Sequence, residues 1–242
     1  MPAPEPRDRL IVALDVETPA HAERLLDQLQ GVVSTFKVGA QLFTAAGPAA
    51  VELIRKRGGR VFLDLKFHDI PNTMAGAVRE ATRLGVAMLT LHASAGRAAI
   101  EAAATAAQTA AKDLGVPKPL GLAVTVLTSL DRAALQRELN VPLSVEGHVL
   151  HLAELARAAG ADGAVAAPSE IRTLRMALGR DWVIVIPGVR PAGSEAGDQA
   201  RVATPEAALR AGADYLVIGR PITASPEPAK AALAILEEMA RA

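Results

Sequence analysis

The sequence of 242 residues has no cysteine and few aromatic side chains: one tryptophan, one tyrosine and four phenylalanines. Without cysteine, the chain has no disulfide bond, no thiolate nucleophile and no cysteine-ligated zinc. The few scattered aromatic residues provide no stacking platform for nucleic acid. Lys plus Arg and Asp plus Glu each total 26, so no net charge attracts nucleic acid or an anionic membrane surface. Any charge that matters must act locally.

Long apolar runs and a leader sequence are missing as well. No run approaches the roughly 18 apolar residues that a membrane helix requires, and the N-terminal MPAPEPRDR lacks the apolar stretch of a signal peptide. We therefore expect a cytoplasmic protein. Residues 1–8 are expected to be a flexible tail, and residues 9–242 are expected to form one catalytic domain.

What the sequence does contain is a repeated alternation of short apolar runs with Ala-rich helical patterns. The predicted strands are residues 10–16, 35–39, 60–66, 87–92, 120–127, 163–167, 182–187 and 215–219. The predicted helices are residues 19–30, 41–57, 73–84, 96–113, 145–159, 169–177, 204–211 and 227–241. Eight such units predict a single-domain α/β fold, the (β/α)₈ TIM barrel, whose active site lies at the C-terminal ends of the strands.

A doubly wound open sheet is the competing architecture. It would usually carry a Gly-rich turn after its first strand, whereas here that strand ends in ALDVETP. One segment, residues 187–205, is long for a loop and rich in Gly and Ala, so we interpret it as a mobile lid.

Charged residues stand near the ends of the first three predicted strands. Asp15 and Lys37 belong to the first two, and Asp64 and Lys66 end the third. Residues two apart on a strand share a face, so Asp64 and Lys66 are expected to point together into the barrel mouth. Because lone buried charges are unfavourable, the lysines and aspartates should neutralise one another and offer a positioned ammonium as an acid. An ordinary salt-bridge ladder at the rim is the alternative.

The segment HDIPNT follows the third strand. Pro71 favours a turn there, and Asn72 or Thr73 could cap the next helix. From the residues alone, capping is the preferred role for Thr73. Asp69 lies just beyond the end of the predicted strand.

A second group of residues predicts an anion site. IPGVRP follows the seventh strand and VIGRPIT the eighth, and each supplies a glycine for close backbone approach and an arginine. A single combination of glycine and arginine would usually indicate only an arginine on the surface. Two pairs, placed at the usual phosphate site of this barrel, predict phosphate contacts from Arg190, Gly219 and Arg220.

The histidines carry weaker signals. His148 and His151 are three apart on a predicted helix but lack a third ligand, so we expect no metal site. His68 and His92 lie at strand ends where an acid or base could act, and a histidine held by rim hydrogen bonds is an equally good interpretation.

The segment LDLKFHDIPNT resembles the signature of orotidine 5′-phosphate decarboxylases. The resemblance extends over nearly the whole chain through ALDV, FKVG, LTS, IPGVRP…GDQ and VIGRPIT. D-x-K-x-x-D alone is shared with other phosphate-binding decarboxylases of the superfamily, and the following I-P-N-T makes it more specific. The resemblance implies cofactor-independent conversion of orotidine 5′-phosphate to UMP and CO₂, the last step of de novo UMP biosynthesis. It also implies a homodimer with shared active sites and no nucleic-acid or membrane partner.

The resemblance further implies roles for the charged residues. Asp15 and Lys37 would bind the ribose hydroxyls, with Lys37 also joining the charged network. Asp64 would lie against the scissile carboxylate, and Lys66 would donate the proton that replaces CO₂ at C6. Asp69 would reach into the active site of the neighbouring subunit.

The remaining implied contacts concern the dimer interface, the base and the phosphate. Thr73 would follow Asp69 across the dimer interface. Thr128 matches a hydroxyl residue near the pyrimidine, although Ser129 beside it leaves this assignment open by one residue. The phosphate group would be closed in by residues of the last two loops, namely Arg190, Gln199, Gly219 and Arg220.

Two other functions remain open at this point. One is a magnesium-dependent sugar-phosphate enzyme of the same superfamily, such as a 3-keto-gulonate-phosphate decarboxylase or a hexulose-phosphate synthase. The other is a barrel that binds a nucleotide without catalysis.

Overall fold

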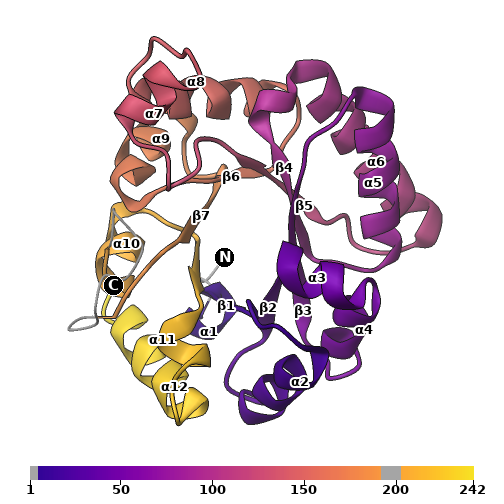
Figure 1. The fold of residues 1–242 in the computed structure, drawn as a ribbon, viewed down its shortest axis with the longest axis vertical. Coiled ribbons are helices and arrows are strands. Elements are labelled where there is room, and N and C mark those ends of the chain that lie inside the picture. Colours follow the sequence, from indigo (N-terminus) through magenta and orange to yellow (C-terminus); the bar gives the residue numbers. More distant parts are fainter. Residues whose placement is uncertain (1–4, 192–202) are drawn as a thin grey trace.

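The computed structural model describes residues 5–191 and 203–242. Its centre is a closed barrel of parallel strands in the order β1 to β8, with the helices in a ring outside (Figure 1). The strands are β1 (Leu10–Ala13), β2 (Thr35–Gly39), β3 (Arg60–Phe67), β4 (Met88–His92), β5 (Leu120–Val124), β6 (Gly163–Val165), β7 (Val183–Pro187) and β8 (Tyr215–Ile218). The predicted (β/α)₈ architecture is confirmed.

Some of the strands end earlier than predicted, where the chain leaves the barrel to form its rim. β1 ends at Ala13 and not at residue 16, and β5 ends at Val124 and not at residue 127. Beyond β1, Leu14 and Val16 remain buried although they are not paired in a strand. Because apolar residues continue past the end of the strand, the sequence predicted a strand that is too long.

The helices are α1 (Pro6–Arg9), α2 (Pro19–Gln28), α3 (Ala40–Ala46), α4 (Ala49–Arg55), α5 (Pro71–Arg83), α6 (Arg97–Leu114), α7 (Arg132–Arg137), α8 (Val145–Ala158), α9 (Ile171–Leu178), α10 (Pro205–Ala211), α11 (Arg220–Thr223) and α12 (Pro228–Met239). Two 3₁₀ turns, η1 (Ala93–Ala95) and η2 (Pro168–Glu170), follow β4 and β6. The helix predicted over 41–57 is split into α3 and α4, because Gly47 has a φ of 59° and Pro48 follows it. The short helices α1, α7 and α11 were not predicted.

Four of the helices begin with a side-chain cap, whereas others, α5 among them, begin without one. The side chains of Thr18, Asp131, Ser144 and Thr204 each accept a hydrogen bond from a main-chain N–H three residues later. Helix α5 instead has Ile70 at its N-cap, without a side-chain hydrogen bond.

The predicted capping role of Thr73 is therefore wrong. Pro71 is the first residue of α5, because its ring already has a helical φ and it has no N–H that needs a partner. Thr73 consequently lies inside the first turn of the helix, where it is exposed.

The core has two layers on either side of the strands. Inside the barrel the packed side chains are Ile11, Ala13, Phe62, Met88, Leu122, Val185 and Val217. Their strand neighbours, such as Leu10 and Val12, belong to the larger layer between strands and helices. Because both faces of the sheet are covered, the strands read as continuous apolar runs, which is why they were visible in the sequence.

The N-terminal end of the chain meets the barrel through α1. The predicted tail, residues 1–8, overlaps this helix, and Arg9 donates hydrogen bonds to the main-chain oxygens of Ala213 (2.5 Å) and Asp214 (3.0 Å). Residues 1–4 lie outside the described residues, so their flexibility stays a prediction. None of the helices in 5–191 and 203–242 is long and apolar enough to cross a membrane.

The tight start of β6 generates a stability prediction. A Cβ at Gly163 would lie 2.3 Å from the main-chain oxygen of Val183 and 2.6 Å from its Cβ. Because main-chain atoms cannot yield easily, Gly163→Ala should lower the free energy of unfolding by about 1–3 kcal/mol. Urea unfolding followed by circular dichroism measures this change.

The matched control is Gly121→Ala on the neighbouring strand β5. There the nearest atoms to an added Cβ are 3.7 Å and 4.0 Å away. This variant should unfold like the wild type or be more stable by up to about 1 kcal/mol. Equal effects of the two substitutions would contradict the steric argument.

Candidate active site

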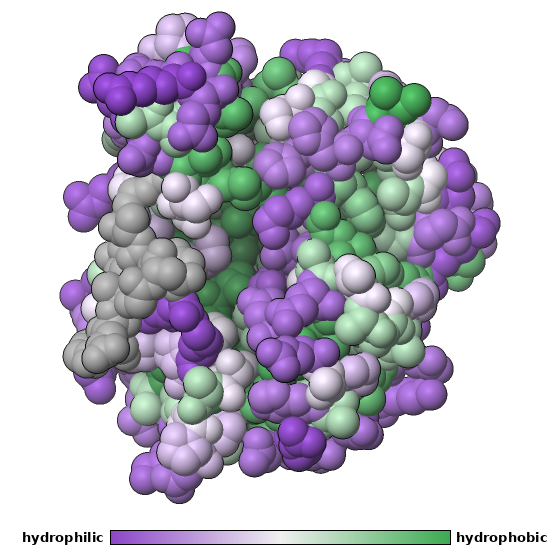
Figure 2. All heavy atoms as spheres, viewed as in Figure 1, coloured by the Kyte–Doolittle hydropathy of each residue, from purple (hydrophilic) through white to green (hydrophobic). Residues whose placement is uncertain are grey.

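The C-terminal ends of the strands surround a hollow that opens on one face of the barrel. Figure 2 shows this hollow in the middle of the face, with hydrophobic side chains in its deep part and hydrophilic side chains on its rim. It contains two adjoining cavities, both lined by Lys37, Asp64 and Lys66. The charged side chains therefore stand where the two compartments meet.

The two compartments differ in chemistry. One is mainly apolar and is lined, beyond the shared residues, by Phe62, Val124, Val126, Leu127, Thr128, Val165 and Ala166. The other is polar and is lined by Asp15, Gly188, Arg190, Gly219, Arg220 and Thr223, among others. The first compartment suits an uncharged, apolar part of a ligand, and the second, with Arg190 and Arg220, suits an anionic part.

The four charged residues predicted at the strand ends form one continuous chain. Lys37 Nζ donates to Asp15 Oδ1 at 2.8 Å and lies 3.4 Å from Asp64 Oδ2. Lys66 Nζ donates to Asp64 Oδ1 at 2.9 Å. The side chains of Lys37 and Asp64 are 11% and 13% exposed, whereas those of Asp15 and Lys66 are 56% and 39% exposed. The middle of the chain is buried, and its two ends open into the cavities.

Asp64 is held ionised by its neighbours. Burial alone would raise the pKa of this carboxyl, but the ammonium groups of Lys37 and Lys66 and the hydrogen bonds from Lys66 and Thr90 outweigh burial. Its pKa is therefore below its ordinary value. At neutral pH the Asp64 carboxylate is therefore negatively charged and lies between the ammonium groups of Lys37 and Lys66.

The reason that Asp64 and Lys66 lie together differs from the predicted one. Regular alternation along β3 was expected to place them on one face. Instead, Lys66 has a φ of 51°, in the left-handed region, and the pairing of β3 with β4 loses register between Leu63 and Phe67. The irregular segment brings the two side chains into contact, while Leu63 and Leu65 pack toward the core.

Gly39, at the end of β2, leaves room for the network. A Cβ at this position would lie 2.9 Å from Asp15 Oδ1 and 3.0 Å from Lys37 Nζ. The glycine of the FKVG segment therefore lets Asp15 and Lys37 meet over the strand.

The polar compartment ends in two arginines. Arg190 is only 8% exposed, and its pKa is lowered by burial and by the nearby guanidinium of Arg220. Two guanidinium groups that repel each other in this way favour an anion between them. Gly188, Gly219 and the hydroxyl residue Thr223 line the same compartment; Thr223, on the short helix α11, was missed in the sequence. Gln199 and most of the predicted lid 187–205 lie outside the described residues.

The predicted residues on the segment after β3 do not reach the network of their own chain. Asp69 and Thr73 are exposed and are not among the described residues that line the two cavities. Asp69 Oδ1 accepts a hydrogen bond from the N–H of Ile70 at 2.7 Å, and Ile70 is itself 68% exposed. The segment presents a carboxylate and an apolar side chain to the outside.

After β5, Thr128 lines the apolar compartment and is half-buried. Ser129 is exposed and is not one of the described residues around that cavity. The fold thus places Thr128, and not Ser129, in the wall of this compartment.

The histidines lie at two places. The rings of His68 and His92 are 5.3 Å apart beside the network, and the pKa of His92 is lowered by burial and then by His68 and Lys66. The rings of His148 and His151 stack at 6.3 Å on α8. In the part of the chain that the structure describes, no three His, Cys, Asp or Glu side chains form a group that could hold a metal ion.

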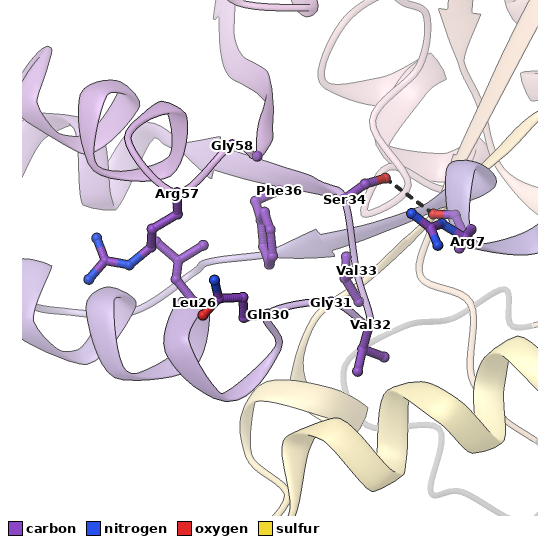
Figure 3. A pocket seen from close by; sticks show the side chains of 11 residues that line it. Arg7, Leu26, Gln30, Gly31, Val32, Val33, Ser34, Phe36, Arg57 and Gly58 are labelled. Carbon is purple, nitrogen blue, oxygen red and sulfur yellow. Dashed lines mark hydrogen bonds between the residues drawn. The ribbon is translucent and has the colours of Figure 1, made fainter.

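A further cavity lies at the opposite, N-terminal end of the barrel, beside Ser34 and Gly59, which precede β2 and β3 (Figure 3). Its most prominent charged residue, Arg57, is already paired with Glu23 at 2.7 Å and Asp27 at 2.8 Å. Charges at this end of such barrels serve stability, because the catalytic loops lie at the other end. The candidate active site is therefore the hollow at the C-terminal ends.

Comparison with known proteins agrees with this geometry. The model of the orotidine 5′-phosphate decarboxylase / HUMPS family matches residues 8–235. The chain belongs to this family. It is 58% identical over 233 residues to the orotidine 5′-phosphate decarboxylase of Moorella thermoacetica, covering 96% of this chain and 92% of the relative. It is 54% identical over 241 residues to that of Syntrophotalea carbinolica, covering 98% and 97%.

A solved structure shows the same fold in the family. The crystal structure of orotidine 5′-phosphate decarboxylase from Lactobacillus acidophilus superimposes with a TM-score of 0.85 at 36% identity. The match covers 95% of this chain and 98% of that one. Membership of the family thus extends over the whole barrel, including both compartments of the hollow.

Proposed function

We propose that the chain converts orotidine 5′-phosphate to UMP and CO₂ without a cofactor, as the last step of de novo UMP biosynthesis. One observation carries this proposal: in a barrel of this family, a chain of alternating charges, buried at its centre, separates an apolar compartment from a compartment with two arginines. The substrate has the matching parts, since a flat pyrimidine and a phosphate are joined by a ribose.

In this proposal, each part of the substrate binds a different set of residues. The pyrimidine lies in the apolar compartment against Thr128, and the phosphate lies with Arg190, Gly219 and Arg220. Ribose hydroxyls bind where the compartments meet, at Asp15 and Lys37, whose paired charges offer both an acceptor and a donor. Gln199 is proposed to join the phosphate contacts.

The reaction needs a fixed positive charge next to C6. When the bond between C6 and the carboxylate breaks, CO₂ leaves and the electron pair stays on a carbon that has no adjacent electron sink. The ammonium of Lys66 stabilises this pair electrostatically and then transfers a proton to C6, which forms the new C–H bond. Solvent returns the proton to Lys66 after UMP leaves.

Asp64 fixes the position of that ammonium. Its carboxylate accepts from Lys66 Nζ on one oxygen and faces Lys37 with the other. Because both ammonium groups are held before the substrate binds, little reorganisation is needed as charge develops on C6. The carboxylate of Asp64 also faces the side on which the substrate carboxylate must lie, so loss of CO₂ removes a like-charge contact.

A homodimer with shared active sites completes the proposal. Asp69 and Thr73 are exposed, and between them lies Ile70, a large apolar side chain that is 68% exposed. A second copy of the chain would cover Ile70 and place Asp69 at the partner's Lys66, which supports assembly around this segment. The lack of cysteine supports a cytoplasmic location.

The first experiment tests the activity and its metal requirement together. Purified protein should consume orotidine 5′-phosphate, followed by the change in ultraviolet absorbance, at the same rate with and without EDTA. Lys66→Ala should lose nearly all turnover but still bind UMP, because the phosphate and ribose contacts remain.

Three results would count against the proposal. Inhibition by EDTA that magnesium reverses would favour the magnesium-dependent relatives. Binding of UMP without turnover in the wild type would favour a nucleotide-binding barrel, and an unchanged kcat in Lys66→Ala would remove the proton-donor role.

The phosphate contacts are tested with a truncated substrate. Arg220→Ala should lower kcat/KM for orotidine 5′-phosphate by about 100-fold or more, because a charge-assisted pair contributes about 1.5–3 kcal/mol and the phosphate supports closure of the site. The slow reaction of unphosphorylated orotidine should hardly change. Equal losses on both substrates would place Arg220 elsewhere.

Mixed dimers test whether Asp69 acts in its own site or in its partner's. Lys66→Ala and Asp69→Ala, each nearly inactive alone, are mixed and allowed to exchange subunits. With a shared site, each heterodimer has one site with both defects and one intact site, so roughly a quarter of wild-type activity should return. If native mass spectrometry detects heterodimers but activity stays absent, Asp69 does not cross the interface.

A further inference from the structure

Thr90 is the polar residue in the middle of β4, and it faces the irregular part of β3. Regular pairing joins Leu63 to Leu89, and it resumes where Phe67 meets Leu91. Three residues of β3, from Asp64 to Lys66, therefore stand opposite the single residue Thr90. The position of Thr90 is secure, because it pairs in regular register with Leu122 of β5 on its other side.

The hydroxyl of Thr90 makes two hydrogen bonds across this irregularity. The main-chain N–H of Lys66 donates to Thr90 Oγ1 at 2.9 Å. Since that bond uses a lone pair of the hydroxyl, its own proton is available to Asp64 Oδ1, 3.0 Å away. One buried side chain thus holds both the backbone of Lys66 and the carboxylate that orients the Lys66 ammonium.

The backbone of Lys66 needs such support. A φ of 51° is uncommon for a residue other than glycine, and such conformations persist where the surrounding structure holds them. Here the side-chain oxygen of Thr90 accepts the amide at a place where the regular strand pairing is interrupted. Valine has the same shape but no oxygen, so threonine and not another β-branched residue is required.

We propose that Thr90 is a positioning residue for the decarboxylation, which locks the strained backbone of Lys66 and the carboxylate of Asp64 into one rigid unit. Thr90 is fully buried and is not among the described residues that line the two cavities, so it acts through these neighbours and does not touch the substrate. This inference rests on the proposed function. It adds a residue to the reaction that the strand-end pattern of charges did not include.

The test compares the hydroxyl with the methyl group of Thr90. Thr90→Val keeps the methyl and loses both hydrogen bonds, whereas Thr90→Ser keeps the hydroxyl. Thr90→Val should lower kcat for orotidine 5′-phosphate by about 10- to 100-fold, as expected for loss of hydrogen bonds that involve a charged group. Its KM and its Kd for UMP should change by less than about threefold. Thr90→Ser should stay within about threefold of the wild type in kcat.

The matched control is Thr35→Val on β2. Thr35 is also fully buried in a barrel strand, but its Oγ1 has no hydrogen-bond partner among the described residues. The same chemical change at Thr35 should leave kcat, KM and the pH profile like those of the wild type. Circular dichroism and thermal unfolding confirm that each variant is folded at the assay temperature.

A second readout does not depend on turnover. The Asp64 carboxyl is titrated by ¹³C NMR and is assigned with Asp64→Asn. Because Thr90 donates to the ionised form, the pKa of Asp64 should be higher in Thr90→Val than in the wild type or in Thr90→Ser. The acidic limb of the kcat profile should move to higher pH in parallel. The other charged or titratable groups around Asp64, unchanged in all variants, are Lys37 with its partner Asp15, Lys66, His68 and His92.

The outcomes separate a positioning role from packing and from failure of the proposed function. A kcat of Thr90→Val within threefold of the wild type, with an unchanged pKa of Asp64, would overturn the inference. So would Thr90→Ser losing as much activity as Thr90→Val, because the methyl would then matter. If Thr90→Val does not fold, Thr90→Ala and Thr90→Ser, which both lack the methyl, give the same comparison. A wild type that never consumes the substrate would refute the proposed function, while the NMR titration would still decide whether Thr90 holds Asp64.

Discussion

The carboxylate of Asp64 is the charge on which the architecture of the barrel mouth depends. A buried ion is stable only when opposite charges and hydrogen bonds replace the water that it loses, and an unpaired one would cost several kcal/mol. Lys37, Lys66 and Thr90 supply this replacement from three neighbouring strands. Each contact therefore constrains a different strand, and the constraints meet at one group.

The network around Asp64 explains why particular residues occur at neighbouring positions. Gly39 must lack a side chain because Asp15 and Lys37 occupy the space above it. Lys66 must leave the regular strand so that its ammonium can return toward Asp64, two residues earlier. Strain at Lys66 is tolerated because the rest of the barrel is regular and tightly packed, so the local distortion cannot spread.

The two ends of the barrel use charge in different ways. At the N-terminal end, Asp162 accepts from Lys118 at 2.6 Å and from the main-chain N–H of Gly121 at 2.8 Å, and Asp214 is bound in the same manner by Arg175 and Ile184. These carboxylates are tied to the main chain and join neighbouring strands. At the C-terminal end, the exposed ends of the network face the cavities instead. Lysine and aspartate residues thus stabilise the fold at one end of the barrel, and at the other end they present charged groups that can bind a ligand.

The sequence by itself determined the barrel and the list of charged residues at its mouth. Apolar runs and helical periodicity are local signals, and strands covered on both faces keep them strong. Once the strands were located, the Asp and Lys residues at consecutive strand ends and the Gly-Arg pairs after the last two strands could be identified from their positions in the sequence. Parallel strands bring their C-terminal ends together, so position along the chain was enough to predict proximity.

Only the tertiary structure decided how these residues are held. Alternation along β3 predicted the contact between Asp64 and Lys66 for the wrong reason. The left-handed backbone at Lys66 brings the two side chains together, and its N–H donates to Thr90, 24 residues later in the chain. No local pattern distinguishes this threonine from an ordinary β-branched strand residue. The failure of Thr73 to cap its helix is different, because it follows from Pro71, which begins the helix two residues earlier and was visible in the sequence. Hydrogen bonds between distant segments, such as that from Lys66 to Thr90, form only when the chain is packed, so no local pattern reveals them.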